Sequence, residues 1–308
     1  MVSQYSWEAA RSFILSHARP LEQSLFSYYF DGGAKADAVN ELSFFQNEDG
    51  GFGNSLEPDF RLAASSPMAT TVGLQIAKEL DLQADHPIVD KAMSYLESSY
   101  DSHTETWHAV PAEVNDVPHA PWWHFDSVKG VCGVESTWAN PNAEIVGYFH
   151  LYRPTNHNVG RWTRKAVKEL ASLPDPIEMH DFLCYSRLLQ CLPQSEMKRE
   201  IHDKLIKSVH GLVCKDPEKW DEYVTKPLMV APSPSSPFYT ELKDEVTLQL
   251  DVEMKKQHDD GYWQPNWTWF GHYEDSWPKA EQEWRGILTL SMLRSIDAFE
   301  KIKKQQTN

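Results

Sequence analysis

The sequence predicts an all-α protein built as an α/α toroid, a barrel of about five to six outer–inner helical hairpins with long loops at one end. Three observations indicate this fold. Prolines repeatedly precede helical segments, helices with one apolar face alternate with more apolar helices, and one turn motif occurs twice. The 308 residues fit one large domain, so we expect a single toroid over residues 1–308. An open helical solenoid is the alternative arrangement.

Proline marks the expected beginning of five helices. It suits the first helical turn because its missing N–H has no partner there in any case. In three cases the residue before the proline is a good N-cap, namely Ser66, Asn140 and Asp175. The five helices are expected to begin at Pro20, Pro67, Pro141, Pro176 and Pro278.

Apolar spacing separates outer helices from inner ones. In residues 35–46, Ala38, Leu42 and Phe45 form one apolar stripe, as expected of an outer helix. In residues 278–299 the apolar residues cover a much wider arc, which suits an inner helix. The expected hairpins pair residues 6–17 with 20–30, 35–46 with 67–80, 88–99 with 141–152, 159–173 with 176–191, and 238–257 with 278–299. A further helix, residues 196–213, lacks a clear inner partner because several prolines follow it.

The loops that lead from outer to inner helices are much longer than those that return. They cover residues 47–66, 100–140, 214–237 and 258–277. In a barrel of hairpins all of these loops emerge at one end, and elaborate loops usually carry the functional site. Nine of the 12 tryptophans lie in them. We therefore expect these tryptophans to cover one another or to line a cavity.

One short motif occurs twice. QNEDGGFG from Gln46 and QHDDGYWQ from Gln257 share Gln-x-x-Asp-Gly, followed within two residues by an aromatic residue. Each copy follows an outer helix and precedes a loop and an inner helix. The glycine permits backbone angles that a side chain forbids, and the aspartate can accept hydrogen bonds from local N–H groups. The duplication favours a structural, repeat-closing turn over a catalytic one.

These two motifs resemble the Gln-x-x-Asp-Gly-Gly-Phe/Trp repeat of the terpenoid cyclase and protein prenyltransferase superfamily, whose members are α/α toroids. The resemblance implies the toroid fold and an isoprenoid or similar apolar substrate. The Asp-x-Asp-Asp and Asp-Asp-x-x-Asp motifs of the cyclases are absent from the sequence. The zinc ligands of the prenyltransferases have only a faint counterpart in His180, Asp181 and Cys184. We expect Asp181 and Cys184 to be a capping acid and a core cysteine.

Two carboxylates in the loop after the first motif are candidate catalytic groups. LEPDFR places Glu57, Asp59 and Arg61 at the end that carries the long loops. Two carboxylates in different surroundings can divide the acid and base roles of proton transfer, and Arg61 is a candidate substrate-binding residue. The structural alternative is that Glu57 or Asp59 pairs with Arg61 or caps the next helix.

The longest loop, residues 100–140, combines aromatic rings, imidazoles and carboxylates. Asp126 is a third candidate catalytic residue, and on an extended segment it faces the same way as His124. One interpretation is a wall or lid of a ligand pocket; the other is plain packing of an insertion over the barrel. The candidate substrate-binding residues of this loop are Trp122, Trp123, His124, Glu135 and Trp138.

The last long loop adds Trp267, Trp269 and His272 as candidate substrate-binding residues. In an extended segment the two tryptophans present their rings on one side, an arrangement suited to stacking on a sugar or shielding a carbocation. Core packing explains them equally well.

Charge and cysteine content argue against several other classes. The net charge is −16 and no basic cluster is present, which argues against a nucleic-acid partner. The four cysteines form neither a disulfide framework nor a zinc motif, so no metal ligands are proposed. No segment has the roughly 18 apolar residues of a membrane-spanning helix, and the N-terminus lacks the features of a signal peptide. We expect a cytoplasmic protein and leave the cofactor and the oligomeric state open.

Three functions remain open. The first is an enzyme resembling the terpenoid cyclases and prenyltransferases, which acts on an isoprenoid or similar apolar small molecule through a loop carboxylate and aromatic faces. The second is a carbohydrate-active enzyme, a glycoside hydrolase or lyase, on an α/α barrel. The third is a non-catalytic module that binds a small-molecule ligand.

Overall fold

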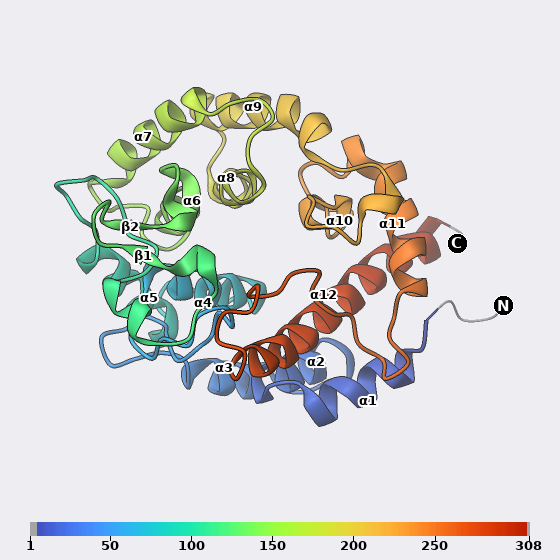
Figure 1. Ribbon diagram of the computed structural model, residues 1–308. Coiled ribbons are helices and arrows are strands. Elements are labelled where there is room, and N and C mark those ends of the chain that lie inside the picture. Colours follow the sequence, from blue (N-terminus) through green and yellow to red (C-terminus); the bar gives the residue numbers. More distant parts are fainter. Residues whose placement is uncertain (1–4, 307–308) are drawn as a thin grey trace. The chain divides into compact units, whose positions relative to one another are not determined.

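A computed structural model describes residues 5–306, with side chains as far as residue 300. The described chain is mostly helical (Figure 1), which confirms the all-α class. Its α-helices are α1 (Trp7–His17), α2 (Pro20–Phe30), α3 (Lys35–Ser43), α4 (Pro67–Glu79), α5 (Pro87–Ser98), α6 (Ala139–Tyr152), α7 (Val159–Ser172), α8 (Met179–Cys191), α9 (Glu196–Leu212), α10 (Pro227–Val230), α11 (Lys243–Lys255) and α12 (Trp277–Gln306).

The remaining regular structure is short. Strands β1 (Phe125–Asp126) and β2 (Val131–Cys132) form an antiparallel pair. The 3-10 helices are η1 (Ala112–Asp116), η2 (Pro121–Trp123), η3 (Gly133–Glu135), η4 (Pro217–Lys219) and η5 (Thr240–Leu242). No helix in the described part of the chain is long and apolar enough to cross a membrane.

The chain divides into two compact units. The central unit comprises residues 42–208 and 269–273, and the terminal unit comprises the described residues up to 41, residues 209–268 and those from 274 onward.

In the central unit, buried helices alternate along the chain with helices that bury one face. Helix α6 buries 12 of its 14 residues, and it packs against α8, α7, α4 and α5. Helix α7 buries only Val159, Trp162, Thr163, Ala166 and Leu170, which form one stripe at helical spacing. Figure 1 shows α6 with α8 on one side and α7 on another. Burial of nearly the whole of α6 and of one stripe of α7 is the pattern that the sequence predicts for an inner and an outer helix.

In the terminal unit, the long helix α12 packs against α1 and α2 (Figure 1), and α10 packs against α11. Leu290, Leu293 and Ile296 of α12 are buried, whereas Ile287 and Leu288 are half-buried. Burial therefore covers only part of the wide apolar arc that the sequence shows on α12. Helix α10 was not expected, because the prolines of this region indicated irregular backbone.

The two Gln-x-x-Asp-Gly motifs form the same turn. The Nε2 of Gln46 donates to the carbonyls of Gly50 and Ile88, both at 2.9 Å. The Nε2 of Gln257 donates in the same way to the carbonyls of Gly261 at 2.9 Å and Ser6 at 3.0 Å. Each glutamine therefore closes its own turn. Each also bonds the backbone at the N-terminus of a neighbouring helix, which is α5 for Gln46 and α1 for Gln257.

The two turns also reach an inner helix in the same way. The backbone N–H of Phe52 donates to Oγ1 of Thr70 in α4, and that of Trp263 donates to Oγ1 of Thr289 in α12, both at 3.0 Å. Asp49 accepts from the Gly51 N–H at 3.0 Å, as predicted. The structural interpretation of the motif is confirmed.

Helix boundaries agree with the sequence where local caps define them. Helices begin at Pro20 and Pro67, and Ser66 caps α4 by accepting from the Ala69 N–H at 3.1 Å. Helix α8 begins at Met179 rather than at Pro176, because the carboxylate of Glu178 accepts from the His180 and Asp181 N–H groups. The prediction that Asp175 caps this helix is therefore wrong.

Candidate functional site

Three segments of the central unit that are far apart in sequence meet at one place: residues 57–61, 118–124 and 269–273. We call them the three-segment cluster. The first two segments are joined by backbone hydrogen bonds, from Arg61 N to Pro118 O at 2.8 Å and from Ala120 N to Asp59 O at 2.7 Å. These bonds place Phe60 opposite His119 as an antiparallel bridge. Two of the long loops therefore pair directly with each other.

The third segment is attached through a side chain. The indole Nε1 of Trp269 donates to Oδ1 of Asp59 at 2.8 Å, and both residues are buried. Glu57 is also buried, and its Oε2 accepts from the Asp59 N–H at 2.7 Å. The two predicted catalytic carboxylates thus have distinct environments. Glu57 fixes the backbone of its own loop, whereas Asp59 faces the segment of residues 269–273.

His119 is a buried imidazole with a defined tautomer. Its Nδ1 lies 2.7 Å from the carbonyl oxygen of Val117, and because a carbonyl only accepts, Nδ1 carries the hydrogen. In the neutral ring the lone pair is then on Nε2, which lies 3.4 Å from Nδ1 of the exposed His124. Burial, followed by the neighbouring His124 and His272, lowers the pKa of His119 below its ordinary value of 6.5. His119 is therefore neutral at pH 7 and equipped to accept a proton.

Aromatic rings surround this histidine. The ring of His119 lies 5.6 Å from that of His124 and 5.3 Å from that of Tyr273. Trp123 packs edge-to-face against Phe60 at 5.1 Å. The Nε1 of Trp123 is buried and has no acceptor among the described residues. A buried indole N–H without a partner costs roughly 1–3 kcal/mol, which a bound acceptor group would offset.

Several other predicted residues also lie in the three-segment cluster. The guanidinium of Arg61 donates from Nη1 to the Pro58 carbonyl at 3.3 Å. The backbone of His272 donates to the Trp269 carbonyl at 2.9 Å, and its ring is exposed. Trp122 is half-buried in η2. The cluster thus contains eight of the twelve residues that the sequence proposed: Glu57, Asp59, Arg61, Trp122, Trp123, His124, Trp269 and His272.

Asp126 has a structural role. Its Oδ1 accepts from the N–H groups of Val128 at 2.9 Å and Lys129 at 3.1 Å, which closes the turn between β1 and β2. These two backbone bonds, with smaller contributions from the Lys129 side chain, lower the pKa of Asp126 below 3.8. His124, two residues earlier, contacts His119 instead. His124 and Asp126 therefore have different partners, although their spacing suggested that they act as a pair.

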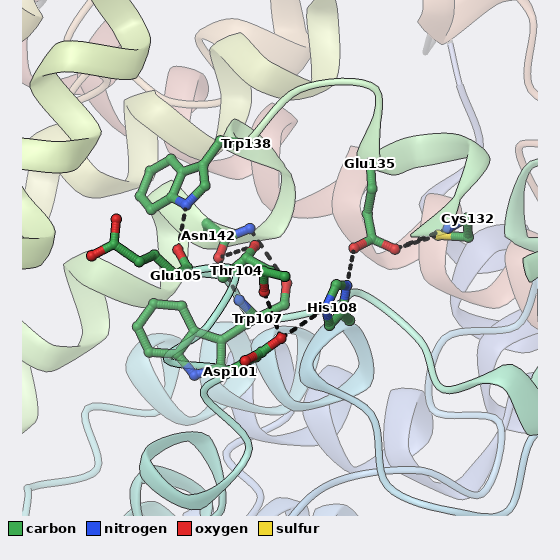
Figure 2. A network of polar contacts seen from close by, with 10 residues as sticks. Asp101, Thr104, Glu105, Trp107, His108, Cys132, Glu135, Trp138 and Asn142 are labelled. Atoms are coloured by element: carbon green, nitrogen blue, oxygen red, sulfur yellow. Dashed lines mark hydrogen bonds and ion pairs between the residues drawn. The ribbon is translucent and has the colours of Figure 1, made fainter. Parts of the chain in front are cut away.

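We call the longest loop, residues 100–140, the insertion. Glu135 and Trp138 lie in a second polar network within it, shown in Figure 2. Oε2 of Glu135 accepts from the backbone N–H of Cys132 at 3.0 Å, and Oε1 lies 3.2 Å from Nδ1 of His108. Trp138 donates from Nε1 to the Glu105 carbonyl at 3.0 Å. Both residues hold the insertion together.

Trp267 and Trp269 have different ring partners. Trp267 belongs to the terminal unit, where its ring lies 5.1 Å from Trp284 and 6.2 Å from Tyr223. Trp269 belongs to the central unit and is fully buried. The ring partners of Trp267 are thus a helix tryptophan and a tyrosine, and not other loop tryptophans.

Three residues have surroundings that the sequence did not indicate. His119 and Tyr273 carried no spacing signal of their own. Asp181 was treated as a cap, but it is buried and its Oδ2 accepts from the Thr137 hydroxyl at 2.8 Å. Burial raises the pKa of Asp181 to about 6. Cys184 is buried, as predicted.

Within the described residues no group of three or more His, Cys, Asp and Glu side chains is arranged to hold a metal ion. Compared with known proteins, the chain matches no family model, no curated protein and no solved structure.

Proposed function

We propose that the chain is a single α/α toroid resembling the terpenoid cyclases and prenyltransferases, and that it is an enzyme. The duplicated turn at Gln46 and Gln257 supports this proposal, because both copies make the same set of bonds to a neighbouring helix and to an inner threonine. The alternating burial of α6 and α7 supports it as well.

The proposed reaction is proton transfer on an apolar small molecule, such as an isoprenoid, at the three-segment cluster. The observation that carries this proposal is the neutral, buried His119, whose Nε2 lone pair faces the exposed His124. In the proposed step a C–H bond next to a cationic carbon of the substrate breaks: the proton binds Nε2 of His119, and the electron pair forms a C=C bond that discharges the cation. His124 then relays a proton to solvent.

The surroundings of His119 fit a substrate on which positive charge develops. Asp59 supplies a buried carboxylate, oriented by Trp269. The ring faces of the cluster stabilise positive charge in the way that aromatic rings bind cations. The Nε1–H of Trp123 is available to a hydroxyl or carbonyl oxygen of the substrate. An isoprenoid alcohol combines an apolar body with such an oxygen.

A carbohydrate-active enzyme with two working carboxylates is favoured less. Glu57 already accepts the Asp59 N–H, and Asp59 already accepts the Trp269 indole. Each carboxylate therefore has a structural partner, and a glycosidase needs both free to act on one bond.

Incubation with a panel of isoprenoid alcohols, diphosphates and hydrocarbons, read by mass spectrometry, tests the proposal. We expect turnover of at least one compound and a loss of about 100-fold or more in kcat for His119→Gln, the scale of general acid–base catalysis. His103→Gln is the matched control, because His103 is exposed and bonds Asp101 only through its backbone N–H. Binding without turnover would favour the non-catalytic module. Absence of binding across the panel, or full activity of His119→Gln, would overturn the proposal.

A further inference from the structure

The insertion that carries His119, Trp123 and His124 is closed at its base by one histidine. His108 lies between two carboxylates, one at each end of the insertion (Figure 2). Its Nε2 is 3.7 Å from Oδ2 of Asp101, and its Nδ1 is 3.2 Å from Oε1 of Glu135. Both ring nitrogens therefore face carboxylates, and only the imidazolium, with a hydrogen on each nitrogen, hydrogen-bonds Glu135 while pairing with the charge of Asp101.

The first end of the insertion is anchored to a helix. Oδ1 of Asn142 in α6 accepts from the backbone N–H of Trp107 at 2.7 Å, directly before His108. The Trp107 indole donates to the Leu96 carbonyl at 2.6 Å. Asp101 is held in its own turn by the Thr104 hydroxyl at 2.6 Å and the His103 N–H at 2.8 Å. His108 therefore projects from a fixed base.

The second end leads to the three-segment cluster. Glu135 belongs to η3, where its Oε2 also accepts from the Cys132 thiol at 3.2 Å. Helix η3 packs directly on η2, and η2 contains Trp123. A short path of contacts thus joins His108 through Glu135 and η3 to the segment that pairs with residues 59–61.

The ionisable groups that face the His108 ring are Asp101 and Glu135, with the Cys132 thiol on the far side of Glu135. Burial, followed by the charge of Glu135, raises the pKa of the Cys132 thiol, which therefore stays protonated. The hydrogen bond that His108 donates to Glu135 is the main influence that raises the pKa of His108 above 6.5. The imidazolium form of His108 is present below pH 6.5 and is lost as the pH rises through the raised pKa of this residue.

We propose that His108 is a positioning residue for the three-segment cluster. As an imidazolium it ties the two ends of the insertion together and keeps the cluster assembled; as a neutral ring it releases Asp101 or Glu135. The consequence for catalysis rests on the proposed function, but the positioning itself does not.

Amide hydrogen exchange in the ligand-free protein tests the positioning. The N–H groups of Arg61 and Ala120 report directly on the joint between the first two segments. After correction for intrinsic exchange, we expect their protection to fall about tenfold between pH 6 and pH 8.5. The midpoint should coincide with the His108 titration followed by NMR.

Two variants complete the experiment. His108→Gln should show the lower protection at both pH values, and His103→Gln should behave as the wild type. Protection that does not change with pH in the wild type, or a midpoint that follows another histidine, overturns the proposal. If His108→Gln fails to fold, the coincidence of midpoints in the wild type still decides the matter. Because no ligand is used, this result is independent of whether the isoprenoid panel shows turnover.

Discussion

The indole Nε1 of Trp269 donates a hydrogen bond to Oδ1 of Asp59 at 2.8 Å, although 210 residues separate them in sequence. The bond fixes a segment from near the end of the chain on the first long loop. Both partners are buried, so this contact matters for both stability and the candidate site.

Trp269→Phe should destabilise the protein by about 1–3 kcal/mol, because it removes a hydrogen-bond donor from the buried carboxylate of Asp59. Urea unfolding monitored by circular dichroism measures the change. Trp267→Phe is the matched control, since Trp267 is half-buried and packs on Tyr223 and Trp284. Equal effects of the two substitutions would show that the hydrogen bond to Asp59 contributes nothing.

Gly50→Ala should be strongly destabilising, by about 3 kcal/mol or more. Gly50 has φ +91°, and an added Cβ would overlap the carbonyl oxygen of Lys91. Gly130 also has a positive φ, +73°, but nothing lies within 4 Å of an added Cβ. Gly130→Ala should cost only about 1 kcal/mol, the strain of the backbone angle alone. Thermal unfolding compares them, and similar losses would contradict the predicted overlap.

Gly261 permits the same test on the second copy of the turn. Its φ is +96°, and an added Cβ would overlap the backbone of Ala9. Gly261→Ala should therefore resemble Gly50→Ala and not Gly130→Ala. A mild effect would mean that the two turns, despite their shared bonds, tolerate change differently.

Asp181→Asn should stabilise the protein above pH 6 and have little effect at pH 4. The folded pKa of Asp181 is raised from 3.8 to about 6. An acid with a raised pKa binds its proton more tightly when folded, so wild-type stability falls as pH rises between these two values. At roughly 1.4 kcal/mol per unit, the gain at pH 7.5 is at most about 3 kcal/mol.

Urea titrations at pH 4 and 7.5 measure this difference. Asp259→Asn is the control, because Asp259 is exposed. A stability gain for Asp181→Asn that is the same at both pH values would show that the charge of Asp181 is not its cause.

Cys132 should react slowly with thiol reagents at pH 8. Burial and the carboxylate of Glu135 raise the pKa of its thiol, and the thiolate is the reactive form. Cys214 is half-buried and should be labelled at least about tenfold faster. Peptide mapping after timed labelling measures both rates. Labelling of Cys132 as fast as that of Cys214 would refute the predicted burial.

The sequence by itself determined the elements whose causes are local. Proline at the first turn and the Ser66 cap define helix starts, and apolar spacing distinguishes α6 from α7. The repeated turn was recognisable because each glutamine side chain donates to the carbonyl of the glycine in its own turn, only a few residues later. Local rules failed at α8, where two acids, Asp175 and Glu178, competed to cap one helix.

Only the tertiary structure decided which loop residues meet. Asp59 and Asp126 are both acids in long loops. Asp59 accepts from a distant tryptophan and Asp126 closes its own turn, and the residue spacing in the sequence does not distinguish these two roles. The difference arises from contacts between segments that are distant in sequence. Burial in the folded structure lowers the pKa of His119, whereas the carbonyl of Val117 fixes its tautomer.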